Sequence, residues 1–134
     1  MGDYNVYVNT EPGFANLVTN TDTLNRIVDP LNKLGAWNNN ATFANIHTQS
    51  THTTQTGGFS SGGMDDRFDI MLCSKSLLVD SLKMRILPQT YIPVGNDGQH
   101  FNLAINAAPT NTSVPTDVLN ALYNMSDHLP IRAD

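Results

Sequence analysis

Residues 67–74, RFDIMLCS, have the clearest strand pattern in the chain, a nearly continuous apolar run that Asp69 interrupts. Such a run is typical of a strand covered on both faces, in the interior of a layered protein of helices and sheets. Cys73 is expected to be a buried thiol within it. A lone buried carboxylate is costly unless a partner satisfies it, so Asp69 requires a hydrogen-bond partner elsewhere in the chain.

Apolar residues recur at helical spacing in three other segments. Residues 13–18 can form a short helix, and Pro115 opens an amphipathic helix. The apolar face of that second helix holds Val118, Leu119, Leu122 and Met125. Residues 24–34 have the same spacing, but Pro30 limits that helix to an end near Asp29. Further strand candidates are residues 43–46, 77–79, 82–87, 91–92 and a last strand after residue 130.

The composition indicates one globular, loop-rich domain. Of the 134 residues only 14% are charged, against a usual share of about 25%. Asn and Thr take their place, and both favour turns and caps. The net charge of −5 and the scattered basic residues disfavour non-specific binding to nucleic acid. We identify no apolar run long enough for a membrane-spanning helix and no signal peptide, and a single cysteine excludes an internal disulfide.

The long polar stretch at residues 35–63 is expected to be a surface excursion that ends in a flexible Gly-rich loop. Three of the four histidines, His47, His52 and His100, fall in polar loops of this kind. The pair Asp65-Asp66 is expected to be a solvated acidic turn.

The fourth histidine, His128, is the natural partner for Asp69. A carboxylate fixes the tautomer of a histidine and stabilises its protonated form. His128 lies between Asp127 and Pro130 in a tight turn, a better-defined setting than that of the other three. The residues alone leave two interpretations, a functional His–Asp pair or an Asp69 that caps a turn beside an ordinary turn histidine. Spacing by itself favours the second, structural interpretation.

Three motifs occur in the order found in one enzyme superfamily: GDYN at residues 2–5, RFDIMLCS at residues 67–74 and SDHLPI at residues 126–131. The chain resembles the endonuclease/exonuclease/phosphatase superfamily. The signatures of that superfamily are Gly-Asp-aromatic-Asn, Arg-x-Asp-aromatic-aliphatic and Ser-Asp-His-x-Pro. The matches span residues 2–131, and the ordered set is far more specific than any single motif.

The resemblance implies an α+β, deoxyribonuclease I-like fold: a four-layer sandwich of mixed or antiparallel β-sheets flanked by helices. It also implies metal-dependent phosphoester hydrolysis. His128 would act at the scissile phosphate, as a general base or as an imidazolium contact, and Asp69 would orient it. Asp3 would align or deprotonate the attacking water, and Asn5 would hydrogen-bond the phosphoryl oxygen. Asp127, together with Asp3, would hold Mg²⁺ or Mn²⁺, for which oxygen ligands are suited.

On this resemblance, residues 1–134 correspond to the C-terminal portion of a single endonuclease/exonuclease/phosphatase domain. The N-terminal half, which in the family supplies the principal metal-binding glutamate, is expected to be missing. One sheet face would then be uncovered, which predicts exposed apolar surface and self-association. The compartment stays open, although the Asn-rich, Gly-rich character is similar to secreted bacterial members of the family.

Two other classes of function are consistent with the sequence. A non-catalytic surface or binding module would use loops 35–63 and 93–115 for recognition, and substituting His128 or Asp69 would then change stability alone. A phosphate-binding pseudoenzyme would keep metal or phosphate affinity without turnover. The substrate class stays equally open, because family members act on nucleic acids, phospholipid headgroups and small phosphoesters.

Overall fold

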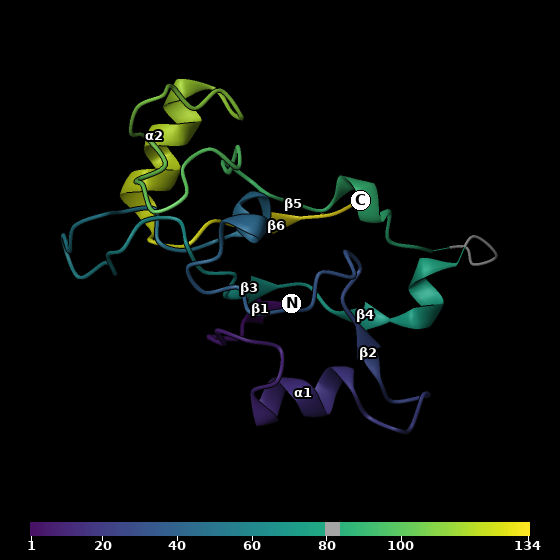
Figure 1. Ribbon diagram of the computed structural model, residues 1–134. Coiled ribbons are helices and arrows are strands. Elements are labelled where there is room, and N and C mark those ends of the chain that lie inside the picture. Colours follow the sequence, from purple (N-terminus) through teal and green to yellow (C-terminus); the bar gives the residue numbers. More distant parts are fainter. Residues whose placement is uncertain (80–83) are drawn as a thin grey trace.

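A computed structural model describes residues 1–79 and 84–134, and its regular elements are short (Figure 1). In chain order they are β1 (Gly2–Asp3), α1 (Pro12–Val18), β2 (Ile27–Val28), β3 (Asp69–Ile70), β4 (Cys73–Ser74), β5 (Ile92–Pro93), α2 (Thr116–Met125) and β6 (Ile131–Arg132), with 3₁₀ helices at Ala41–Ile46, Lys75–Leu78 and Pro88–Thr90. Loops and turns join these elements, as the Asn- and Thr-rich composition predicted.

The strands pair into short antiparallel sheets of two strands each: β1 with β3, β2 with β4, and β5 with β6. In the first of these sheets Asp3 lies opposite Asp69. The expected α+β class is therefore confirmed as a small mixed domain with short antiparallel sheets. Within residues 1–79 and 84–134, no helix combines the length and the apolar character needed to cross a membrane.

Residues 67–74 connect two of these sheets. The run divides into β3, which pairs with β1, and β4, which pairs with β2. Between the two strands, Met71 donates its backbone N–H to the Tyr91 hydroxyl, 3.1 Å away. The predicted strand is thus correct in location but divided, because no single partner strand follows the whole run. Cys73 is buried, as expected.

Both of the stronger helix predictions are confirmed, as α1 and α2. Their apolar faces are less covered than the spacing predicted. On α1, Phe14 and Val18 are buried whereas Leu17 is exposed. On α2, Leu119 is buried whereas Met125 reaches solvent.

Three weaker predictions are wrong. Where a helix ending near Asp29 was expected, the Asp22 carboxylate accepts from the Leu24 N–H at 2.9 Å and closes a turn, and the chain continues into β2. Residues 43–46 and 77–79, expected to be strands, belong to 3₁₀ helices or, at residue 79, to the end of one. The strand candidate at 82–87 begins outside the described residues.

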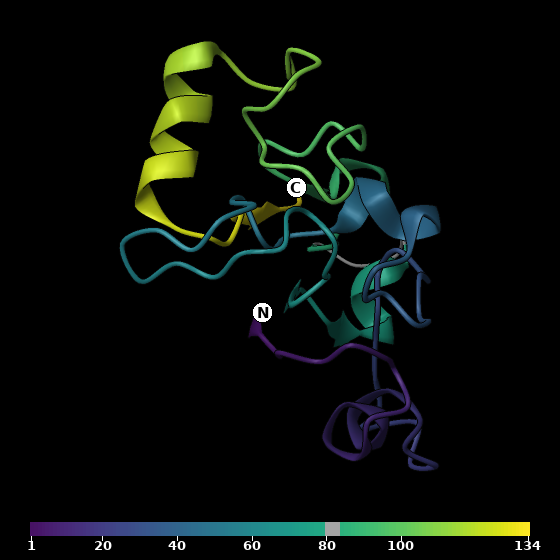
Figure 2. The ribbon, with the colours of Figure 1, turned by 60° about the vertical axis from the view of Figure 1, so that its left-hand side comes forward.

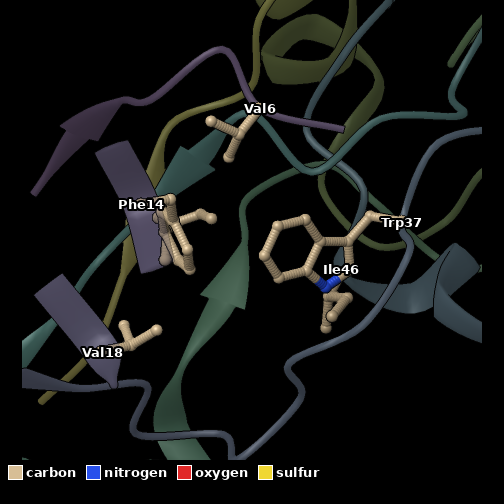
Figure 3. Packing of buried hydrophobic residues seen from close by; sticks show 6 residues of the cluster. Val6, Phe14, Val18, Trp37 and Ile46 are labelled. Atoms are coloured by element: carbon tan, nitrogen blue, oxygen red, sulfur yellow. The ribbon is translucent and has the colours of Figure 1, made fainter. Parts of the chain in front are cut away.

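Two hydrophobic clusters form the core, each packed against one helix. The first contains Val6, Phe14, Val18, Trp37, Ile46 and Ile70, and in Figure 3 the Phe14 and Val18 side chains of α1 face Trp37. The Phe14 and Trp37 rings meet edge to face with centroids 5.5 Å apart, a favoured aromatic geometry. The second cluster contains Met64, Ile105, Leu119 and Leu129. Helices α1 and α2 lie at opposite ends of the molecule in both views (Figures 1 and 2).

A largely buried polar segment, residues 47–51, lies between the chain near residue 66 and the turn at residues 127–129, and we call it the central segment. Thr48 N and Gln49 N donate to the Asp66 carbonyl at 2.7 and 3.1 Å. On the other side, Thr51 N donates to the Asp127 carbonyl at 3.0 Å, and Leu129 N donates to the Thr48 carbonyl at 2.8 Å. The expectation of a surface excursion across residues 35–63 is wrong here, because hydrogen bonds satisfy the polar groups that this segment buries.

The three histidines assigned to polar loops are also buried. His47 contacts the Trp37 carbonyl through Nε2 at 3.0 Å, and the pKa of His47 is lowered because burial disfavours its charged form. The His52 ring stacks on Tyr123 with centroids 4.0 Å apart. His100 contacts the Asp97 carboxylate through Nδ1 at 2.8 Å. Each has local partners that account for it structurally.

A buried ion pair joins residue 67, at the entry to β3, to the loop that follows β2. Arg67 Nη1 and Nη2 donate to the two carboxylate oxygens of Asp29 at 2.8 and 2.9 Å, with side-chain exposures of 0% and 1%. Burial alone raises the pKa of Asp29, but the hydrogen bonds and charge of Arg67 outweigh it, so the pKa lies below its ordinary value. This bidentate geometry is the strong form of an arginine–carboxylate contact.

Candidate active site

The site centres on a hydrogen bond between the side chains of Asp69 and His128. Asp69 lies in β3, and His128 lies in the turn between α2 and β6. His128 Nδ1 and Asp69 Oδ2 are 2.7 Å apart, and the two side chains retain exposures of 23% and 18%. The residues that the sequence singled out are therefore in contact, and both remain accessible to a small molecule.

The central segment holds this pair in place. The Thr48 hydroxyl accepts from the backbone N–H groups of Phe68 and Asp69, at 3.1 and 3.0 Å. The Thr48 carbonyl accepts from Leu129 N, next to His128. One buried threonine thus fixes the backbone on both sides of the His–Asp contact.

The charge of His128 is set by the carboxylates around it. The pKa of His128 is raised, first by the hydrogen bond that its Nδ1–H donates to Asp69, against the opposing effect of burial, and further by the negative charges of Asp69, Asp3 and Asp127. A carboxylate beside an imidazole favours the protonated form in this way. The carboxylates therefore favour the protonated form of His128 over the neutral one more than water would.

Asp3 faces the same site from the neighbouring strand. It is the register partner of Asp69 in the β1–β3 pair, and opposed residues in an antiparallel pair project to the same side. Asp3 Oδ1 accepts from Asn5 N at 2.8 Å, and Asn5 has a positive φ of 47°. This short turn places Asn5, the other predicted N-terminal site residue, directly after Asp3.

Asp127, the residue before His128, is held by two hydrogen bonds. Its Oδ2 accepts from Ser60 N at 2.8 Å and from Gln49 Nε2 at 3.3 Å. Burial raises the pKa of Asp127, but the hydrogen bonds from Ser60 outweigh this and the net pKa is lowered. Asp127 is therefore ionised at neutral pH.

Gln49 is the site residue that sequence reasoning missed. Its Nε2 lies 2.8 Å from His128 Nε2, the nitrogen that does not contact Asp69. The same amide nitrogen donates to Asp127, so it can donate to His128 Nε2 when the imidazole is neutral and Nδ1 carries the proton. Once Nε2 is protonated, the amide must turn its oxygen toward the ring. A lone Gln in a Thr-rich polar stretch gave no signal of this role.

The acidic residues before β3 depart from the expected solvated turn. Asp66 is buried, and Asn38 Nδ2 donates to its Oδ1 at 3.0 Å. Burial, and then the neighbouring charge of Asp66, raise the pKa of Asp65 to about 6. These two carboxylates belong to the interior that supports the site.

The expected metal ligands, Asp3 and Asp127, both border His128, since both charges act on its imidazole. In the part of the chain that the structure describes, no group of three or more His, Cys, Asp or Glu side chains is arranged to hold a metal ion. Mg²⁺ commonly uses one or two protein carboxylates and completes its shell with waters and substrate phosphate. Asp3 and Asp127 supply the number of carboxylates that this mode uses.

No family model, curated protein or solved structure matches this chain. The three sequence motifs and the geometry around His128 are therefore the features that point to a function.

Proposed function

We propose that this chain carries the His–Asp part of a metal-dependent phosphoesterase site, within a fold of the deoxyribonuclease I-like sandwich type. The observation that carries the proposal is the 2.7 Å contact between His128 Nδ1 and Asp69 Oδ2, which joins residues of two motifs that lie 59 positions apart in the sequence. A partly exposed histidine that is oriented by a carboxylate and has further carboxylates nearby is an arrangement that can support hydrolysis of a phosphoester.

In this proposal His128 acts through Nε2. Asp69 holds Nδ1 and thereby presents the second nitrogen to a phosphoryl oxygen. The raised pKa of His128 favours the imidazolium contact over the general-base role. A preorganised donor of this kind stabilises the charge that develops on phosphoryl oxygens in the transition state.

Asp3 and Asn5 complete the chain's own contribution. Asp3 projects to the side on which Asp69 lies and can align an attacking water, and the Asn5 amide can donate to the phosphate. Asp127 and Asp3 would hold Mg²⁺ or Mn²⁺, which when bound supplies neutralising charge at the phosphate. Because these are few ligands, we expect weak metal binding and slow turnover by the isolated chain.

The test is hydrolysis of bis(p-nitrophenyl) phosphate with Mg²⁺ or Mn²⁺, comparing the chain with His128→Ala and with Asn16→Ala, an exposed position on α1. We expect His128→Ala to lose roughly 10²-fold or more of the metal-dependent rate, the usual scale for one acid–base or charge-stabilising group. Asn16→Ala should leave the rate unchanged. Equal metal-dependent rates in all three proteins would overturn the proposal.

A phosphate-binding pseudoenzyme is the second candidate, and the position of Gln49 favours it, since its amide contacts the nitrogen a substrate would need. This alternative predicts measurable Mg²⁺ or phosphate affinity that Asp127→Ala abolishes, with no turnover in any variant. Isothermal titration beside the rate assay separates the two candidates.

A further inference from the structure

A pocket of about 310 Å³ opens directly beside the His–Asp pair. Asp69, Ser126 and His128 form its polar end, and its other walls are the apolar side chains Leu122, Met125, Leu129 and Pro130. This volume is at the lower limit for small-molecule sites, so it suits one small substituent rather than an entire large ligand.

The apolar lining residues of the pocket differ in their exposure to solvent. Leu129 is 1% exposed and belongs to the second hydrophobic cluster. Gly95 packs so closely that an added Cβ would lie 2.7 Å from Leu122 Cδ1. Met125, at the rim, is 75% exposed and unbranched, so it can fold over an apolar group that enters.

The charges near the pocket limit its ligand to few negative groups. In the described part of the chain, no lysine or arginine lines it. Arg67 is held by Asp29, and Arg132 pairs with Asp134. Asp69 and His128 are the titratable residues in its lining. A carboxylate in the lining and no basic side chain there disfavour a polyanion such as nucleic acid, so a ligand with a single negative charge is the better match.

We propose that this pocket binds an apolar substituent of a phosphodiester whose phosphate contacts His128, so that the substrate class is an alkyl or aryl phosphodiester. The inference depends on the proposed function for the location of the phosphate. It goes further by naming the group next to the phosphate and the side chains that select it. Burying one ring or short alkyl chain in the pocket contributes affinity that a methyl ester cannot reach.

The test is NMR titration of the chain, with Mg²⁺ present, using dimethyl, dibutyl and diphenyl phosphate. Resonances of the His128 imidazole report on the phosphate, and methyl resonances of Leu122 and Met125 report on the pocket. We expect all three esters to shift the His128 imidazole resonances. Of dibutyl and diphenyl phosphate, the one that fits the pocket better should bind roughly tenfold more tightly than dimethyl phosphate. Only dibutyl and diphenyl phosphate should shift the methyl resonances of Leu122 and Met125. Whichever of these two esters binds more tightly shows whether the pocket prefers an alkyl or an aryl substituent.

Met125→Gln keeps side-chain length and helix propensity but makes the rim polar. We expect it to reduce the preference for the larger esters about threefold. The matched control is Met84→Gln, whose methionine is 71% exposed and lies outside the pocket, and it should leave the preference intact.

Equal affinities for all three esters, with His128 still responding, would overturn this inference and leave the proposed function standing. No response of His128 to any ester would overturn both. Pocket methyl shifts that follow protein concentration and do not respond to ester would mean that a second copy covers the pocket, which also overturns the inference.

Discussion

The Gln49 amide donates toward the imidazole nitrogen that a phosphoester would contact. A donor at this nitrogen favours the neutral ring, in opposition to the carboxylates that favour the charged one. We therefore expect Gln49, which belongs to none of the predicted motifs, to favour the neutral form of His128.

Replacing Gln49 by Glu is expected to raise the pKa of His128 further, because a carboxylate would then accept from the protonated Nε2. Gln49→Ala should raise it less, since it removes the donor without adding charge. The measurement is a pH titration of the His128 imidazole by NMR. Gln55→Glu, an exposed glutamine in the same polar stretch, is the control for a general charge effect. An unchanged or lowered His128 pKa in Gln49→Glu would contradict this role.

Asp65 makes the free energy of unfolding depend on pH. Its pKa is raised from 3.8 to about 6, by burial and by the charge of Asp66. A carboxyl with a higher pKa in the folded chain binds more protons when folded, so stability falls as pH rises through that window.

Asp65→Asn should therefore stabilise the fold by about 1 kcal/mol at pH 7, a value discounted for the partial exposure of the side chain. Below pH 3.8 the variant and the original chain should converge. Urea unfolding of both proteins at pH 7 and below pH 3.8 measures the difference in their free energies of unfolding. Greater stabilisation at the acidic pH would show that the sign is wrong.

At the scale of elements, the Arg67–Asp29 pair ties β3 to the loop after β2. Breaking a fully buried pair leaves one charge without compensation, so Arg67→Met should cost about 3–5 kcal/mol in the free energy of unfolding. The lowered pKa of Asp29 means that the stability contributed by its charge is present at neutral pH and is lost as pH falls through the folded pKa.

A double-mutant cycle measures this coupling by denaturant unfolding. Asp29→Leu combined with Arg67→Met should recover much of the loss, because no buried charge then remains. The control is Arg132→Met, which removes the exposed pair with Asp134 and should have little effect. Strictly additive losses at Asp29 and Arg67 would show that the two are not coupled.

The helices were predictable because α1 and α2 have clear apolar spacing and a proline at or just before the first helical residue. The short polar elements were not. At residues 22–25 and 40–42, Asp and Asn side chains bond to nearby backbone groups, and such local contacts override a weak periodic pattern. The split of residues 67–74 was equally hidden, since it depends on which strands pair with each half.

At the scale of the whole molecule, each described sheet has two strands, so each strand has an edge without a strand partner. Two-stranded sheets are marginal alone, and open edges favour pairing with another chain. We expect self-association that increases with protein concentration, measured as a rise in mass by light scattering after gel filtration. A constant monomer mass across the accessible concentration range would contradict this expectation.

By itself, the sequence determined the α+β character, the two helices, the loop-rich organisation and the candidate pair Asp69 and His128. The α+β class came from the resemblance of three motifs to a known superfamily. The helices, the loops and the candidate pair depend on periodicity, composition, proline placement and the cost of burying a lone carboxylate, all of which are local properties. Only the tertiary structure decided that a polar segment, residues 47–51, is the buried support of the site. It also decided that Gln49 contacts Nε2 of His128, the ring nitrogen that does not contact Asp69. Polar residues can be buried wherever distant parts of the chain supply their hydrogen-bond partners, and those partners lie far apart in sequence.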